Sequence, residues 1–268
     1  MTFSRTSRTW RFAFLTDTPS GVDRMNARPL CVIVGAEEGL GASLAAAFAA
    51  EGCDLALLSP TLADSREALG AARKARPDGR AVTFDCDPAT SEAVERALVG
   101  VAQDMGPIDV LIYNVRPAVA FIPPLEITPT ALRDMLEIEA VAAFAAARTV
   151  LPKMIEHGAG TLIFTSATAA LRGAANGLTF ATSKFALRGM AQSLAKAYAS
   201  KGIHVVHVRL DCYLDDAFAR RTMGEQFREE FAAKTSDVAQ AYLHAYKQPR
   251  SAWSNEIELR PHRENWTF

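Results

Sequence analysis

The sequence has few cysteines, no long apolar run and no excess of charge of either sign. Its four cysteines lie far apart without a Cys-x-x-Cys pair, which disfavours a disulfide framework and a zinc site. The longest apolar run, residues 140–147, is much shorter than the ~20 residues of a membrane-spanning helix. The 29 basic and 30 acidic residues give a net charge of -1, which does not favour nucleic acid or an anionic membrane as a partner. We therefore expect a soluble, cytoplasmic protein whose cysteines are reduced and whose partner is a small molecule.

Motifs for several other chemistries are also missing. The five histidines form no His-Glu-x-x-His or similar spacing, so we expect no metal site. There is no Gly-x-Ser-x-Gly motif and no Walker lysine, so esterase and kinase functions lack a nucleophile or a phosphate clamp. Hydrophobic residues make up 49% of the chain and charged residues 22%, which is typical of a globular protein.

The first 28 residues differ from the remainder. They are rich in Arg, Ser and Thr, and only Asp17 and Asp23 are acidic. This composition is compatible with a transit peptide, but Met25 lies just before the first apolar segment and favours an upstream start codon. We expect residues 1–28 to be a mobile extension and residues 29–268 to form one domain.

From residue 30 onward, short apolar segments alternate with longer segments of helical periodicity. The expected strands are 30–34, 54–58, 81–84, 109–112, 161–165, 203–208 and 257–259. The expected helices are 40–51, 62–75, 91–104, 129–156, 179–200, 216–233 and 236–247. Strands that are apolar on both faces and separated by helices predict an α/β fold: a Rossmann-like, doubly wound parallel sheet with helices on both faces.

The turn after the first expected strand is rich in glycine. It reads Gly35-Ala36-Glu37-Glu38-Gly39-Leu40-Gly41. In a doubly wound sheet this turn binds phosphate, because glycines let a pyrophosphate approach the backbone N–H groups at the helix start. We expect Gly35, Glu37, Glu38, Gly39, Leu40 and Gly41 to border a dinucleotide. The alternative is a glycine-rich turn that binds nothing.

The Gly-x-x-x-Gly-x-Gly spacing resembles the short-chain dehydrogenase/reductase family, and the resemblance extends over residues 30–259. Asp85, followed by Cys86, falls where the family has an Asp that contacts adenine. Asn114 and Val115 fall within the family's Asn-Asn-Ala-Gly segment. The resemblance implies an NAD(P)-dependent oxidoreductase acting on an alcohol or carbonyl compound.

The resemblance breaks down at the catalytic positions. The family's Tyr-x-x-x-Lys is matched by a segment that begins with Phe180 and ends with Lys184. The family's Ser is replaced by Ala167, and its Asn on the fourth helix by Glu139. Because a phenyl ring has no titratable proton, the sequence predicts that the usual general acid is missing and that Phe180 serves as a wall.

A substitute acid/base site is conceivable. Lys184 would hydrogen-bond the ribose of the nicotinamide. Glu139 would face Lys184 and relay protons, with Ser166 or Thr168 supplying a hydroxyl to the substrate. The alternative for Glu139 is an exposed helix residue beside Glu137.

The choice of coenzyme follows from two positions. Ser59 stands where the family often has an Asp for the NAD ribose, and it would serve either coenzyme. Glu38 would repel the 2′-phosphate of NADP, which gives a slight preference for NAD. The substrate is not readable, because in this family it depends on the segment that corresponds to residues 211–234.

Two functions remain open, and so does the assembly. The first is an oxidoreductase with an altered acid/base site, and the second is a non-catalytic dinucleotide-binding sensor or partner subunit. The family resemblance and the Ala-rich helices imply a homodimer or homotetramer.

Overall fold

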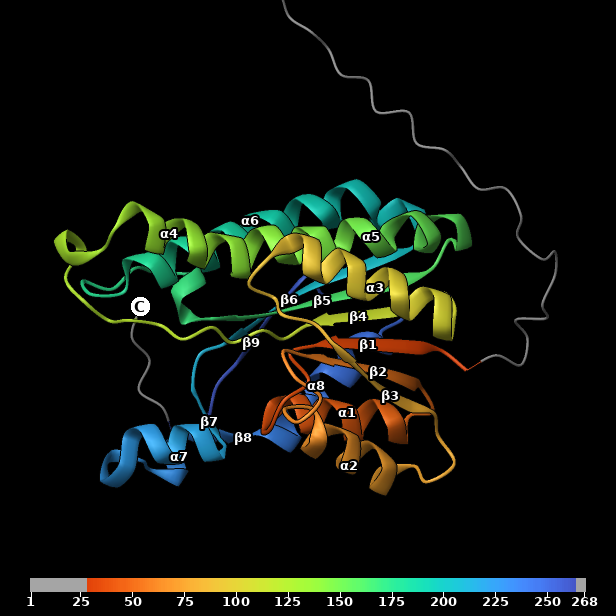
Figure 1. Ribbon diagram of the computed structural model, residues 1–268, viewed down its shortest axis with the longest axis horizontal. Coiled ribbons are helices and arrows are strands. Elements are labelled where there is room, and N and C mark those ends of the chain that lie inside the picture. Colours follow the sequence, from red (N-terminus) through yellow and green to blue (C-terminus); the bar gives the residue numbers. More distant parts are fainter. Residues whose placement is uncertain (1–27, 264–268) are drawn as a thin grey trace, which may run out of the picture.

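The computed structural model describes residues 28–263, and seven of its strands form one parallel sheet (Figure 1). The strands of this sheet are β1 (Leu30–Val34), β2 (Asp54–Ser59), β3 (Ala81–Asp85), β4 (Val110–Tyr113), β5 (Gly160–Ala167), β6 (Ile203–Leu210) and β9 (Glu256–Leu259). The helices are α1 (Leu40–Ala50), α2 (Arg66–Ala75), α3 (Ser91–Met105), α4 (Pro129–Leu136), α5 (Ala142–His157), α6 (Leu178–Tyr198), α7 (Ala217–Met223) and α8 (Thr235–Tyr246).

The strand order places a crevice beside the glycine turn. The order is β3-β2-β1-β4-β5-β6-β9, so the chain reverses its direction of winding between β1 and β4. Val34, the last residue of β1, pairs with Leu58 of β2 and with Tyr113 of β4. Ligands of such sheets bind at the carboxyl ends of the strands at this reversal. The expected doubly wound α/β fold is confirmed.

Helices cover both faces of the sheet, and each face has its own apolar core. Side chains of α3, α5 and α6 pack on one face, and those of α1, α2 and α8 pack on the other (Figure 1). The central strands are buried on both sides, which is why their sequences are continuously apolar. The four cysteines are free, as expected.

Two expected helices differ from the structure. The segment 129–156 is divided into α4 and α5 by a π-helical turn, Glu137–Val141. The expected helix 216–233 is wrong beyond Met223. Helix α7 ends at Met223, and the next residue, Gly224, has a positive φ of 51° that favours glycine. The chain later forms the short strand β8 (Ala232–Lys234), which pairs with β7 (Tyr213–Asp215).

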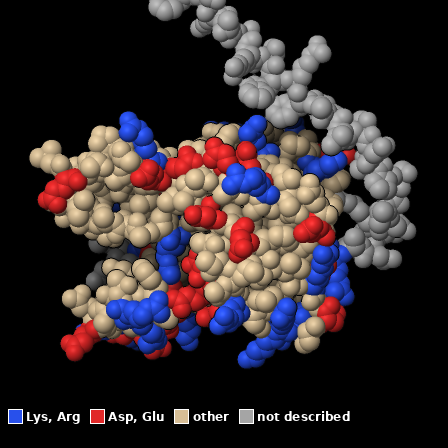
Figure 2. All heavy atoms as spheres, viewed as in Figure 1, with Lys and Arg blue, Asp and Glu red and all other residues tan. Residues whose placement is uncertain are grey.

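The expected extension lies almost wholly outside the described residues, since only Arg28 belongs to both. Within residues 28–263, no helix combines the length and the apolar character that crossing a membrane requires. On the face shown in Figure 2, acidic and basic side chains are interspersed. A cleft opens at the left of this view, between the part of the molecule that contains α4 and the part that contains α7.

Candidate active site

The glycine turn is held in a narrow space against the end of β4. Gly35 has a φ of 83°, and a Cβ atom on it would lie 2.5 Å from the carbonyl oxygen of Asn114. A Cβ atom on Gly41 would lie 2.8 Å from the carbonyl oxygen of Gly35. Both contacts are too short for any side chain, so the close packing of turn, helix and strand requires glycine.

A chain of hydrogen bonds connects this turn to the inner strands. The Asn114 amide donates to the carbonyl of Gly35 at 3.1 Å, and its oxygen accepts from the Thr165 hydroxyl at 2.9 Å. The Tyr242 hydroxyl donates in turn to Thr165 at 2.9 Å. Asn114 therefore holds the glycine turn against β4 and β5, and it does not line the cavity that lies beside the turn.

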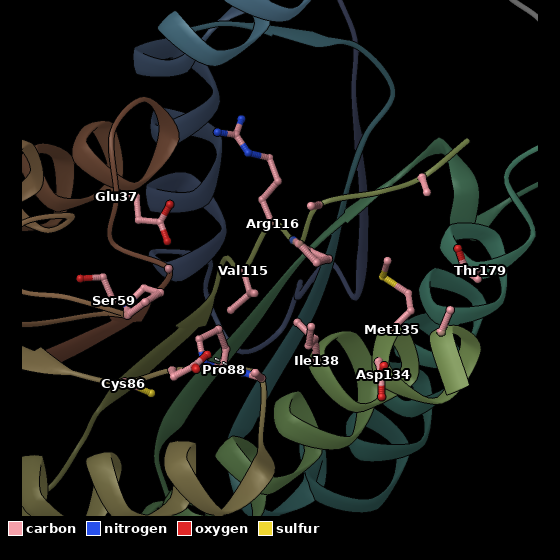
Figure 3. A pocket seen from close by; sticks show the side chains of 18 of the residues that line it. Glu37, Ser59, Cys86, Pro88, Val115, Arg116, Asp134, Met135, Ile138 and Thr179 are labelled. Carbon is pink, nitrogen blue, oxygen red and sulfur yellow. Dashed lines mark hydrogen bonds between the residues drawn. The ribbon is translucent and has the colours of Figure 1, made fainter. Parts of the chain in front are cut away.

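A cavity of about 470 Å³ lies above the ends of β1, β2 and β4 (Figure 3). Of the predicted coenzyme residues, Gly35, Glu37, Ser59, Cys86 and Val115 line it. On the far side of Val115 it continues between α4 and the start of α6, where its lining is mainly apolar and includes Met135 and Ile138. A cavity of this size is within the range of small-molecule sites.

Other predicted coenzyme residues lie elsewhere. Asp85 is exposed at the end of β3 and does not line the cavity, whereas its neighbour Cys86 does. Glu38 points away and pairs with Arg221 of α7 at 2.7 Å. The Ser59 hydroxyl is already engaged, because it donates to the carbonyl of Thr61 at 2.7 Å and lies 2.5 Å from the Ser65 hydroxyl.

Glu37 is half-buried in the cavity wall. Burial raises the pKa of its carboxyl group, and the neighbouring carboxylates of Asp64 and Glu38 add to this effect, while Arg116 opposes it. The glycine turn therefore carries a carboxylate whose proton affinity is increased.

Glu139 and Lys184 form a buried ion pair. Lys184 Nζ donates to Glu139 Oε2 at 2.6 Å, and the two side chains are only 5% and 1% exposed. Burial raises the pKa of Glu139, and Lys184 opposes that shift. The π-helical turn carries Glu139 toward α6, so the exposed position considered as the alternative is wrong.

Phe180 forms part of the surroundings of this pair. Its ring centre lies 5.7 Å from Lys184 Nζ, and its edge packs against Phe121 with ring centres 6.3 Å apart. The ring therefore lies between the Lys184 ammonium group and Phe121 of the loop after β4, where it acts as an apolar barrier on one side of the pair.

The two predicted hydroxyls have different surroundings. Ser166 Oγ is buried and has no hydrogen-bond partner among the described residues. The Thr168 hydroxyl donates to Asp211, which is paired with Arg260. Since Thr168 is already engaged, Ser166 is the hydroxyl with unused hydrogen-bonding capacity.

Four residues that were not predicted to belong to the site lie beside the glycine turn or contact a residue that does. They are Arg116, Asp216, Phe218 and Arg221. Asp216 caps α7, and its side chain is buried. The sequence could have indicated Arg116, because this large cation stands at the end of the segment that resembles Asn-Asn-Ala-Gly, where the family has glycine.

Known proteins match most of the chain. Residues 30–223 match the short chain dehydrogenase family. The D-threitol dehydrogenase of Mycolicibacterium smegmatis is 31% identical over 144 residues, which are 53% of each chain. The match thus spans about half the length of this curated relative.

Solved structures match more completely. A short-chain dehydrogenase from Rhodopseudomonas palustris has 32% sequence identity and a TM-score of 0.74, and the match covers 87% of this chain and 99% of that one. An alcohol dehydrogenase from Thermococcus sibiricus, complexed with 5-hydroxy-NADP, has 19% identity and a TM-score of 0.78 over 90% of this chain and 100% of that one. With a family match over more than half of its length, the chain belongs to the short-chain dehydrogenase family.

Proposed function

We propose that this protein is an NAD(P)-dependent oxidoreductase that acts on an alcohol or carbonyl compound with an altered acid/base site. The observation that carries the proposal is the buried Glu139–Lys184 pair. Ile138 and Thr179, which precede Glu139 and Phe180 in the chain, line the cavity that continues from the glycine turn. The backbone next to Glu139 therefore borders this cavity, and we place the pair behind this part of its wall.

The residues of the turn fit a dinucleotide on its adenosine side. The positions of Gly35 and Gly41 have no space for a side chain of their own. Cys86 and Val115 line the cavity and would pack against a flat, apolar ring. The archaeal relative that holds an NADP derivative supports the same assignment. The slight preference for NAD loses its basis, since Arg221 neutralises Glu38 and the Ser59 hydroxyl is engaged. We therefore propose NAD or NADP without preference.

A bound nicotinamide coenzyme would supply or accept the hydride. Lys184 also donates to the Thr165 carbonyl at 3.4 Å, and it would bind a ribose hydroxyl of this coenzyme through its remaining N–H group. Glu139 would exchange a proton with Lys184 Nζ, because burial raises the pKa of its carboxyl group toward the range where proton transfer is effective. The Ser166 hydroxyl would hydrogen-bond the substrate oxygen.

The missing tyrosine sets the expected rate. A positioned general acid contributes roughly 10²- to 10⁴-fold, whereas orientation of the reactants contributes up to about 7–11 kcal/mol. A member of the family that has Phe180 in place of the tyrosine would therefore be slow rather than inactive.

The proposal is tested by coenzyme binding and turnover. NAD and NADP are titrated by calorimetry, and wild type is assayed with a panel of alcohols and carbonyl compounds. We expect binding and slow turnover that falls in Lys184→Ala and in Glu139→Gln. Absence of binding to either coenzyme would refute the proposal.

A second function is favoured by the packing of Phe180 on Phe121, which leaves no proton donor at this position. In this alternative, the protein binds a dinucleotide as a sensor or partner subunit and has no catalytic activity. It predicts coenzyme binding without turnover in wild type, and turnover only in a variant that carries both Phe180→Tyr and Ala167→Ser.

We also propose a homodimer or homotetramer that associates through α5 and α6. Three large apolar side chains on or next to these helices, Val141, Phe144 and Phe185, are each more than 40% exposed. If these side chains lie together, they would form the kind of apolar patch that marks an association surface.

A further inference from the structure

The carboxylate of Asp216 lies directly on the glycine turn. A Cβ atom on Gly39 would be 2.9 Å from Asp216 Cβ and 3.0 Å from its Oδ2. The Asp216 side chain is only 2% exposed. A negative group from a segment far along the chain therefore covers the residue at which α1 begins.

Two hydrogen bonds hold this carboxylate in place, and a ring contact holds the arginine. Arg116 donates to Oδ2 at 3.0 Å, and the backbone N–H of Ala219 donates to Oδ1 at 2.7 Å. The Arg116 guanidinium also lies 4.0 Å from the centre of the Phe218 ring. The same Oδ2 atom thus accepts from the guanidinium group and fills the space where a side chain on Gly39 would lie.

The start of α1 attracts an anion at this place. Gly39 provides no side-chain cap to the helix, so the N–H groups of the first turn and the positive end of the helix dipole are not satisfied by a side chain. Arg116 adds a full positive charge, which is paired with Oδ2 at 3.0 Å. A carboxylate oxygen that lies close to both the helix start and this charge occupies the position of a ligand anion.

A diphosphate and Asp216 cannot share this position. Both need the space over Gly39 and both need Arg116. Glu37 adds another carboxyl group beside the turn, and the remaining carboxylate there, Glu38, is already paired with Arg221. Repulsion between the diphosphate and Asp216 would be strong, because the Asp216 carboxylate is only 2% exposed.

We propose that Asp216 is an internal competitor of the coenzyme and that Arg116 is a diphosphate-binding residue released when Asp216 leaves. This inference rests on the proposed dinucleotide site, and it adds that the Asp216 carboxylate occupies the diphosphate position when no coenzyme is bound. When the coenzyme binds, Arg116 transfers from Asp216 to the diphosphate, and the start of α7 moves away from the turn. The ligand-free protein keeps this position filled with a carboxylate, which lowers its affinity for the coenzyme.

The test compares two single charge changes in neighbouring residues. Asp216→Asn retains a side chain that caps α7 but removes the charge over Gly39. Asp215→Asn is the matched control, since it removes the same charge from a residue that pairs with Arg220 at 2.7 Å. Arg116→Gln removes the guanidinium group. The dissociation constants of NAD and NADP are measured by calorimetry for all four proteins.

We expect Asp216→Asn to bind the coenzyme about tenfold more tightly than wild type, and Asp215→Asn to bind within about twofold of wild type. Arg116→Gln should bind about tenfold more weakly. Amide hydrogen exchange over α7, measured without ligand, should become faster in Asp216→Asn and stay unchanged in Asp215→Asn.

Two results would overturn the inference while leaving the proposed function intact. One is equal coenzyme affinity in Asp216→Asn and Asp215→Asn. The other is unchanged or increased affinity in Arg116→Gln, which would make Arg116 only a holder of Asp216. If no variant binds NAD or NADP, the dinucleotide site itself is refuted.

Discussion

Removing the charge of Glu139 tests whether the ion pair at the centre of the candidate site is truly shielded from water. In Glu139→Gln, the Lys184 ammonium keeps a hydrogen-bond acceptor but loses its counter-charge at 2.6 Å, in a place where its side chain is 5% exposed. Breaking a buried pair at one partner costs about 3–5 kcal/mol, because the remaining charge is uncompensated. Because Gln retains a hydrogen-bond acceptor, we expect the free energy of unfolding to fall by about 3 kcal/mol, which corresponds to a decrease in melting temperature of roughly 6–12 °C.

The assay is urea unfolding at pH 7, and the chain offers a matched control. Lys153 and Glu156 form a pair of the same chemistry at 2.7 Å, but both side chains are more than half exposed. Glu156→Gln should therefore cost less than 1 kcal/mol. Adding Lys184→Met to Glu139→Gln should restore most of the lost stability, since a neutral buried pair has no charge to desolvate. An equal cost for Glu139→Gln and Glu156→Gln would refute the reasoning, because it would mean that water reaches the inner pair.

Three further predictions concern acid stability, the glycine turn and assembly. Burial lowers the pKa of His207 from its ordinary 6.5 to about 4. The protein should therefore lose about 3 kcal/mol of stability as the pH falls from 6.5 toward 4, because the unfolded chain binds the proton more readily. His207→Leu should flatten the dependence of the urea midpoint on pH over this range. Gly41→Ala should weaken coenzyme binding measured by calorimetry, because its Cβ would lie 2.8 Å from a backbone oxygen, whereas Gly100→Ala, which meets nothing within 4 Å in α3, should stabilise the protein by about 0.5–1 kcal/mol. Phe185→Glu should reduce the molar mass measured by light scattering if α6 forms a subunit interface, and an unchanged mass would argue against that interface.

The fold was predictable because its signals are local. The central strands β1 and β4 are continuous apolar segments, and most strands are followed by a helical pattern, so the order of elements could be read without knowledge of their contacts. The glycine turn was equally accessible, since the spacing of Gly35, Gly39 and Gly41 reflects steric limits within a few residues.

The break in the helix 129–156 was less accessible. A π-helical turn differs from an α-helix by one residue in its hydrogen-bond spacing, and the sequence periodicity over such a short segment does not reveal it. Its consequence is large, because it decides whether Glu139 faces solvent or faces Lys184.

The sequence by itself determined the parallel sheet, the glycine turn and the chemical types available near it, because these depend on apolar periodicity and on steric rules that act over short distances. Only the tertiary structure decided which charges meet. Glu139 and Lys184 are 45 residues apart, and Arg116 and Asp216 are 100 residues apart. The strength of each pair depends on how completely the surrounding helices exclude water, and this exclusion is a property of the packed molecule.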